Sequence, residues 1–426
     1  MTSLSFRKIL LMATVATTAL GISQTAHAAG FYIQEQSVQG LGSAFSGSTT
    51  TLNDPSTIYF NPAGMTNLPG YQAQAGVHLL MPTSKIKDTG SSAPATATLG
   101  GASGNPYDPT PVPNGFMSAE LGHGFWAGIG MTAPFGLASE YKDGWFGRFD
   151  STKTELTVID IQPTLAYKIN NRISVGVGVN FQHADADLRN RVMLGAATEG
   201  NSKLSGDDWG YGYSLGVQIR PTDSTTIGLD YKSEVHHHLD GKIQVTNMAG
   251  AIVGVGTVST DGSAKLTTPD HATLGIAHKL NDKLTLQGQA TWFGWNNFDN
   301  ITAFRASGAQ ASRVDQNYQT TWALAVGAEY EANDAWTLRG GMQFDQTPTT
   351  DEYRTSRTPD GDRTWVSLGA TYDISPAWDM DMAATYIFID EEEINLTRST
   401  ATGNAVIRGE TEGNVGILAL SATYKF

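Results

Sequence analysis

Several groups of side chains in this sequence have types and spacings that could do chemistry. Three consecutive histidines at 236–238 could bind a metal ion, because imidazole is a common metal ligand. No second ligand cluster accompanies them, so we interpret them as solvated loop histidines. A hydrolase could use His78, His271 or His278 with one of the many serines, but no nucleophile motif accompanies these histidines. The residues therefore predict no metal site, no cofactor and no enzyme.

Charged side chains offer a different kind of chemistry, the binding of an acidic ligand. Arg339 falls on the polar face of an alternating segment, and Arg189 and Arg191 lie in a long polar stretch, so these three are candidate carboxylate partners. Acidic residues share the same polar faces, which leaves a neutral ligand open: Asp160, Asp379 and Asp381. The acidic run 390–393 could hold divalent cations at a lipopolysaccharide surface, but it is more typical of a solvated face.

The first 28 residues form a leader segment, and the strands and loops that carry the residues above come after it. Residues 1–28 combine a basic start, an apolar stretch and the small-x-small ending Ala26-His27-Ala28, which predicts a cleaved secretory signal peptide. Without Arg7 and Lys8 the formal charge falls from −14 to −16, which argues against nucleic-acid binding. There are no cysteines, so no disulfide framework is expected.

From Tyr71 onward, strand-like segments arrive in pairs, and fourteen can be counted. Within a pair the connection is a short turn: 122–124, 170–171, 221–223, 281–282, 332–334 and 374–376. Between pairs we expect long polar loops: 82–114, 142–153, 185–207, 235–267, 295–317, 346–362 and 390–413. An even strand count with alternating short and long connections is typical of bacterial outer-membrane barrels. We therefore predict a 14-stranded antiparallel transmembrane β-barrel over 71–426.

Polarity along the strands supports a closed barrel. In 284–292, apolar residues alternate with Thr285, Gln287, Gln289 and Thr291, as expected for one lipid face and one lumen face. A soluble sandwich would show the same alternation, so we also use the aromatic residues, which gather near both ends of the strands like two interfacial girdles. Those near the short turns are Tyr167, Tyr330, Trp336, Tyr372, Trp378 and Tyr424; those near the long loops are Phe181, Tyr231, Phe293, Tyr318, Phe344 and Phe388.

Residues 29–70 lack strict alternation yet carry many apolar side chains that need burial. Val38, Leu41 and Phe45 have helical spacing, and Asp54-Pro55 resembles a helix start. We predict a small helical hatch folded into the barrel lumen. A periplasmic docking segment is the alternative.

This hatch resembles the N-terminal hatch of FadL-type long-chain fatty-acid transporters. The resemblance rests on 40–44 (GLGSA), 53–56 (NDPS) and 59–65 (YFNPAGM), and it continues through 134–140, 145–149 and 161–167. The resemblance marks as hatch-motif residues Asn53, Asp54, Pro55, Asn61, Pro62, Ala63 and Gly64. The family also includes uptake channels for aromatic hydrocarbons.

Two further sites follow from residues and resemblance together. Pro134 and Gly136 interrupt the strand pattern of 125–141, and a proline in a closed barrel must sit at a bulge or kink. The resemblance implies that this kink opens the wall sideways, at Ala133, Pro134, Phe135 and Gly136. Alternatively, the strand ends there. Trp145, Phe146 and Phe149 follow in a polar loop, where they could capture an apolar ligand or pack against a neighbouring loop.

We therefore expect passive uptake of hydrophobic compounds, most simply long-chain fatty acids, across the outer membrane of a Gram-negative bacterium. Neutral hydrocarbons, a plain porin and an outer-membrane lipid hydrolase are the alternatives. The expected partners are the transported molecule, outer-membrane lipid with lipopolysaccharide, and the barrel-assembly machinery. For the last, the alternating C-terminal strand ending at Phe426 resembles an assembly signal. We expect a monomer.

Overall fold

The computed structural model describes residues 30–195, 198–247 and 258–426. The predicted signal peptide and the first predicted hatch residue lie outside these ranges. The short helices are α2 (Val38–Gly42), α3 (Thr57–Phe60), η1 (Pro62–Asn67) and η2 (Trp295–Asn297). The strands are β1 (Tyr71–Asp88), β2 (Thr110–Gly122), β3 (Phe125–Glu140), β4 (Lys153–Lys168), β5 (Ile173–Gly195), β6 (Thr198–Ile219), β7 (Thr225–Lys232), β8 (Val235–Asn247), β9 (Val258–Thr268), β10 (His271–Lys279), β11 (Leu284–Phe293), β12 (Asn300–Arg305), β13 (Gln310–Asp315), β14 (Thr321–Asn333), β15 (Trp336–Asp345), β16 (Arg363–Ser375), β17 (Trp378–Thr400) and β18 (Gly403–Lys425).

The sheet closes on itself as a cylinder. β1 pairs with β2 on one side and with β18 on the other, so the first and last strands meet. Four strands (β8, β9, β12 and β13) form hairpins beyond the cylinder, and the other fourteen are antiparallel barrel staves. The predicted strand count is therefore confirmed. Each of the six predicted short turns lies between two consecutive staves.

Five of the predicted long loops are wrong in part, because they contain stretches of strand; in 82–114 these are the end of β1 and the start of β2. The stretches 185–207 and 390–413 are mostly the outer ends of the β5–β6 and β17–β18 hairpins, whose ladders continue to the tips. The stretches 235–267 and 295–317 contain β8–β9 and β12–β13. Above the lipid-facing band the outer face of a strand meets water, and the inner face is apolar only in short runs such as Ile394 and Leu396, so the ladder continues without a long stretch of alternating polarity. Sequence periodicity therefore does not detect these extensions.

The two faces of the staves divide as predicted, with two exceptions. On β11, Leu286 is exposed on the outer surface, whereas Gln287 and Gln289 are buried in the lumen. The predicted outer girdle is wrong at Phe293 and Tyr318, which are buried inside the cylinder. Phe293 lies on the same face of β11 as Thr291, so strict alternation already directs it inward. The outward aromatic Trp322, on β14, was not predicted.

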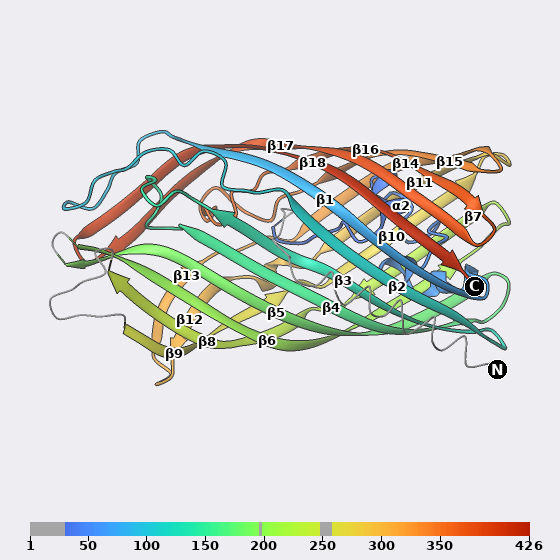
Figure 1. Ribbon diagram of the computed structural model, residues 1–426, viewed down its shortest axis with the longest axis horizontal. Coiled ribbons are helices and arrows are strands. Elements are labelled where there is room, and N and C mark those ends of the chain that lie inside the picture. The colour runs from blue at the N-terminus through green and yellow to red at the C-terminus, as the bar shows by residue number, and fades with distance from the viewer. Residues whose placement is uncertain (1–29, 196–197, 248–257) are drawn as a thin grey trace.

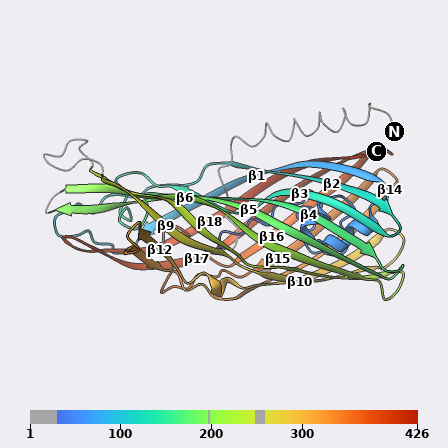
Figure 2. The same cartoon turned by 90° about the horizontal axis from the view of Figure 1, so that it is seen from below.

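Residues 30–70 lie inside the cylinder, at the end where the chain terminates (Figures 1 and 2). The predicted helix over Val38, Leu41 and Phe45 is shorter than its spacing suggests. It ends at Gly42, because Ala44 and Phe45 both have positive φ angles, of 50° and 60°. Phe45 nevertheless packs in the hatch core with Leu41 and Ile58. This hatch closes the cylinder from within.

Candidate functional site

The β3 strand carries a bulge at the predicted kink. Thr132 pairs with Asp160 and Phe135 with Val158, so Ala133 and Pro134 together oppose the single residue between those partners on β4. β3 does not end there but continues to Glu140. On its other edge, the pairing with β2 ends at Met131, opposite Gly115. Above this point the wall loses the β2–β3 ladder.

The start of the hatch takes the edge of β3 that β2 leaves. The Ile33 N–H donates to the carbonyl of Pro134 (2.8 Å), and the Gly136 N–H donates to the carbonyl of Phe31 (2.8 Å). The side-chain amide of Gln36 meets both backbone groups of Ala133. The unpaired groups expected beside the proline are therefore satisfied by the hatch rather than by water.

The hatch motif residues serve the lower hatch. Asn61 donates from Nδ2 to the carbonyls of Thr49 (3.0 Å) and Val217 (3.1 Å), and its Oδ1 accepts the N–H of Ala63 (3.1 Å). Pro62 follows as the first residue of η1, a position where its missing N–H has no consequence.

The remaining motif residues have smaller roles. Asp54 accepts the N–H of Ser56 (2.8 Å) and is buried, whereas Asn53 is exposed. Gly64 lies so close to Thr57 that an added Cβ would come within 2.0 Å of the hydroxyl. Together these contacts shape the hatch and its fit to the wall, and they bring no group of the motif to the β3 bulge.

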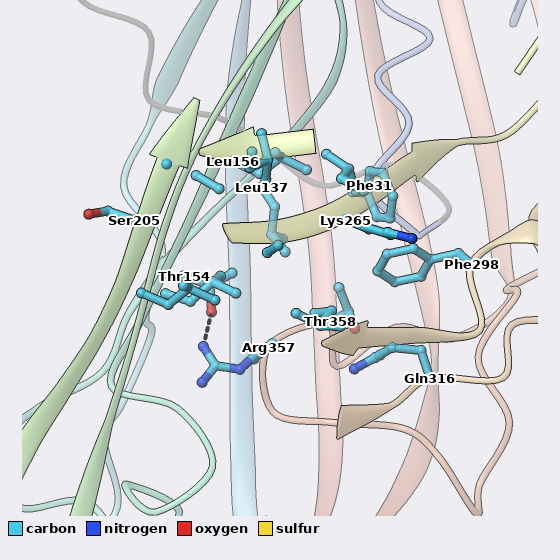
Figure 3. Close-up of a pocket in the computed structure, with 18 of the residues that line it drawn as sticks. Phe31, Leu137, Thr154, Leu156, Ser205, Lys265, Phe298, Gln316, Arg357 and Thr358 are labelled. Carbon is cyan, nitrogen blue, oxygen red and sulfur yellow. Dashed lines mark hydrogen bonds between the residues drawn. The ribbon is translucent and has the colours of Figure 1, made fainter. Parts of the chain in front are cut away.

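An apolar pocket lies on the outer side of the hatch, beside β3. Most of the side chains that line it are apolar, as is usual for small-molecule sites. Phe31 of the hatch and Leu137 of β3 both line it. Figure 3 shows these two side chains with Leu156 and Phe298 around the pocket. The other contributors come from β4, β5, β6, β8, β9, β12, the segment between β13 and β14, and the loop before β16.

Two cationic side chains line this pocket, and neither was predicted. Arg357, in the loop before β16, donates to the Thr154 hydroxyl (3.2 Å), as Figure 3 shows. Lys265, on β9, is exposed at the rim. Both fall within stretches that the sequence marks only as polar loops. The signal that could have found Arg357 is its place among uncharged residues, Thr355-Ser356 before it and Thr358-Pro359 after it.

The three predicted carboxylate partners lie elsewhere and have acidic partners of their own. Arg339 donates to Glu329 (2.7 Å), Arg189 to Asp187 (2.6 Å), and Arg191 pairs with Asp143 (2.8 Å). None of the three lines the apolar pocket. Their ligand-binding role stays a prediction, and these ion pairs do not favour it.

Comparison with known proteins identifies the family. The family described as "Outer membrane protein transport protein (OMPP1/FadL/TodX)" matches residues 19–426. The long-chain fatty acid transport protein of Escherichia coli O6:H1 is 27% identical, with 95% of this chain and 96% of that relative covered. A crystal structure of a Pseudomonas aeruginosa FadL homologue superposes with a TM-score of 0.87 at 27% identity, covering 93% and 100% of the two chains. The Ralstonia pickettii toluene transporter TbuX has a TM-score of 0.67 at 20% identity, covering 91% and 100%, and shows the fold alone.

This chain belongs to the FadL/TodX family. It is therefore an outer-membrane transporter of hydrophobic compounds rather than an enzyme, and its barrel lies in the outer membrane of a Gram-negative bacterium. In the described part of the chain, none of the helices has the length and apolarity that a membrane crossing requires.

In this FadL/TodX chain, the three loop aromatics are buried. Trp145, Phe146 and Phe149 are between 1% and 3% exposed. Trp145 stacks on Tyr141 with ring centroids 4.0 Å apart and donates from Nε1 to the Ser151 carbonyl (2.7 Å). Burial of this kind favours packing against neighbouring loops. Their role in ligand capture stays a prediction.

A buried carboxylate joins the outer loops above the pocket. Asp150 accepts the N–H of Ser356 (2.9 Å) and pairs with Arg398 (2.6 Å), while its carbonyl accepts Nη2 of Arg357 (2.7 Å). Burial would raise the pKa of the Asp150 carboxyl, but Arg398, Arg357 and the hydrogen bonds from Ser356 outweigh burial and hold the pKa below its usual range. The Asp150 carboxylate therefore stays ionised, and the backbone carbonyl of the same residue holds Arg357 at the pocket wall.

Proposed function

We propose that this FadL/TodX member takes up long-chain fatty acids, binds them in the apolar pocket beside Phe31, and releases them sideways through the wall at the β3 bulge. The observation that carries this proposal is the pairing of an apolar lining with two cationic side chains. A hydrocarbon chain gains free energy by leaving water for such a lining. The carboxylate of a fatty acid gains binding free energy when it pairs with a cation, and a neutral ligand has no charge to pair with it.

The pocket and the bulge share two structural elements. Phe31 lines the pocket, and its carbonyl accepts the hydrogen bond from Gly136 on the other side of the bulge. Leu137 of the pocket is the next residue of β3. A molecule that leaves the pocket past Phe31 therefore reaches the part of β3 that has no β2 partner, and through it the lipid. Entry from the loops around Trp145, Phe146 and Phe149 would complete the route.

A neutral aromatic hydrocarbon is the second candidate, and one observation favours it. Phe31, Phe135, Trp295, Phe298 and Tyr318 form a chain of edge and tilted ring contacts beside the pocket, with centroids 4.8–6.4 Å apart. Such rings suit an aromatic guest. Toluene transporters share this fold, so an aromatic hydrocarbon is a specific alternative to a fatty acid.

Substitution of Lys265 separates the two substrates. We expect Lys265→Gln to weaken fatty-acid binding by up to roughly fivefold, the scale of an exposed ion pair, and to leave the methyl ester of the same acid and toluene unchanged. Lys242→Gln, on β8 outside the pocket lining, is the matched control. The measurement is equilibrium binding to the purified barrel in detergent. Equal loss for acid and ester would contradict a carboxylate partner.

Mass spectrometry of molecules retained by the purified protein tests the substrate class independently. Free fatty acids would support the proposal, whereas neutral hydrocarbons would favour the second candidate. Steady ion conductance in a planar bilayer would instead indicate a plain porin. We further propose that the barrel is monomeric, that lipopolysaccharide surrounds its outer end, and that the C-terminal strand directs assembly by the barrel-assembly machinery.

A further inference from the structure

Two prolines stand on the β2 edge that faces the wall opening. The Glu120 N–H donates to Gly70, at the start of β1, and the β1–β2 register is unbroken from Ala119 back to Thr110. Successive residues of a strand direct their backbone groups to opposite edges. Even-numbered residues of β2 therefore pair with β1, and odd-numbered residues face β3. Pro111 and Pro113 are odd-numbered, so the opening is bordered by two residues without an N–H.

Pro113 stands where a partner for the bulge is missing. Gly115 is the last β2 residue paired with β3, opposite Met131. Two residues further along the same register, Pro113 would oppose Ala133. Proline has no N–H to give to the Ala133 carbonyl, so the ladder cannot continue with both of its hydrogen bonds.

Gln36 supplies what Pro113 lacks. Its Nε2 donates to the Ala133 carbonyl (2.9 Å), and its Oε1 accepts the Ala133 N–H (3.2 Å). The same Nε2 also reaches the Ile33 carbonyl (3.3 Å), which ties the amide to its own segment. Gln36 is fully buried. A hatch side chain thus imitates a strand neighbour across the bulge.

The gap that results is bounded at both ends. Below, it ends at the Gly115–Met131 pair; above, the Glu140 N–H donates to the Pro106 carbonyl (2.8 Å). A strand neighbour in this gap would be permanent, since many hydrogen bonds would have to break together. At Ala133 a single side-chain amide can leave and return alone, at the expense of two net hydrogen bonds, while the backbone bonds of Phe31 and Ile33 hold β3 further up.

We propose that Pro111 and Pro113 keep β2 from pairing with β3 above Gly115, and that Gln36 is the removable bolt that closes the slot they leave. This inference rests on the proposed lateral release, because it names the residues that hold the exit shut. Gln36 is a positioning residue: it acts through Ala133 and need not touch the transported molecule.

Labelling of a single cysteine tests the bolt without any transported ligand. The chain has no cysteine of its own, so Ala133→Cys gives one reactive site. The rate of its reaction with a lipid-soluble maleimide, in barrels reconstituted in vesicles, reports whether the slot is open. We expect Gln36→Leu to raise this rate about tenfold, the scale of two lost hydrogen bonds.

Gln34→Leu is the matched control, because Gln34 lies in the same segment but bonds to Gln343 of β15 (2.9 Å). It should leave the labelling rate unchanged. Restoring the N–H groups with Pro111→Ala and Pro113→Ala should let β2 pair with β3 and suppress the increase caused by Gln36→Leu. Equal rates for Gln36→Leu and Gln34→Leu, or no suppression by the alanines, would overturn the inference.

Fatty-acid uptake by the same variants separates the bolt from the proposed function. Faster labelling of Gln36→Leu together with altered uptake supports both. Faster labelling with unchanged uptake supports the bolt and removes the slot from the transport route.

Discussion

The hatch has two parts that the barrel holds in different ways. The lower part, 37–67, touches the wall around its circumference through side chains of several staves. Gln162 of β4 donates to the Ile58 carbonyl (2.8 Å), Gln218 of β6 to the Thr49 carbonyl (2.9 Å), and Thr66 donates to Ser174 of β5 (2.8 Å). The upper part, 30–36, follows a single strand edge on β3 and has few further bonds. The lower part is therefore fixed to the wall, whereas the upper part can separate from β3.

Glycines of the wall explain why the lower part is fixed. A Cβ at Gly341 would come within 2.1 Å of the Ser43 carbonyl oxygen, and one at Gly228 within 2.2 Å of the Thr49 carbonyl oxygen. The hatch backbone therefore lies directly against stave backbone at these points. Such contacts leave no room for sliding.

Two engineered disulfides test whether uptake requires only the upper part of the hatch to move. We expect the disulfide in the upper part to change uptake more than the other substitutions below. Tyr32 and Phe135 are directly opposed, between two flanking backbone hydrogen bonds, so Tyr32→Cys with Phe135→Cys can bridge the upper part to β3. We expect oxidation to abolish uptake and reduction to restore it. Thr66→Cys with Ser174→Cys locks the lower part, and uptake should continue. Uptake through the oxidised upper lock would show that the upper part need not leave β3.

Gly228→Ala should give the next largest effect, because its new methyl group meets hatch backbone rather than a flexible side chain. We expect a loss of about 1–3 kcal/mol in stability and a rise in ion conductance as the lower hatch loosens. Thermal unfolding in detergent measures the stability, and planar-bilayer recording measures the ion conductance. Gly288→Ala on β11 is the control, since its Cβ would meet nothing closer than 3.8 Å. Equal behaviour of the two variants would contradict a tightly held lower hatch.

Asp150→Asn should give a smaller, pH-dependent effect on the loops that cover the upper hatch. The folded pKa of Asp150 lies below its ordinary value of about 4. Its contribution is therefore complete at neutral pH and is lost as the pH falls through the folded pKa. At pH 7 the variant should lose roughly 1 kcal/mol of stability, because the partly exposed Arg398 loses its ionised partner but keeps some contact with water. Thermal unfolding should show the difference from the parent protein shrinking in acid, and a constant difference would contradict this assignment.

Much of the barrel could be predicted because strand polarity and tight turns depend on residues that are close together in the sequence. Alternation places Gln287 and Gln289 in the lumen, and the six turns follow from short breaks in the pattern. The extended hairpins and the inward positions of Phe293 and Tyr318 were missed. In the hairpins the ladder continues where polarity no longer alternates, and the two rings were grouped with the girdle by their place near the loops rather than by strand face.

The binding pocket could not be predicted in the same way. Arg357, Lys265 and Phe31 come from a loop, an outer hairpin and the hatch, and only the closed cylinder brings them together. Conversely, Trp145 and Phe149 read as exposed loop aromatics because the hairpins that bury them have no marker in the sequence.

By itself, the sequence determined a cylinder with an internal stopper and a proline in its third stave, because strand polarity and the missing proline N–H act within a few residues. The tertiary structure alone shows that Gln36, 97 residues before Ala133, completes the hydrogen bonds of that stave, and that Arg357 and Lys265 line the pocket. Those contacts depend on the closure of the sheet, which sets distances that no local pattern encodes.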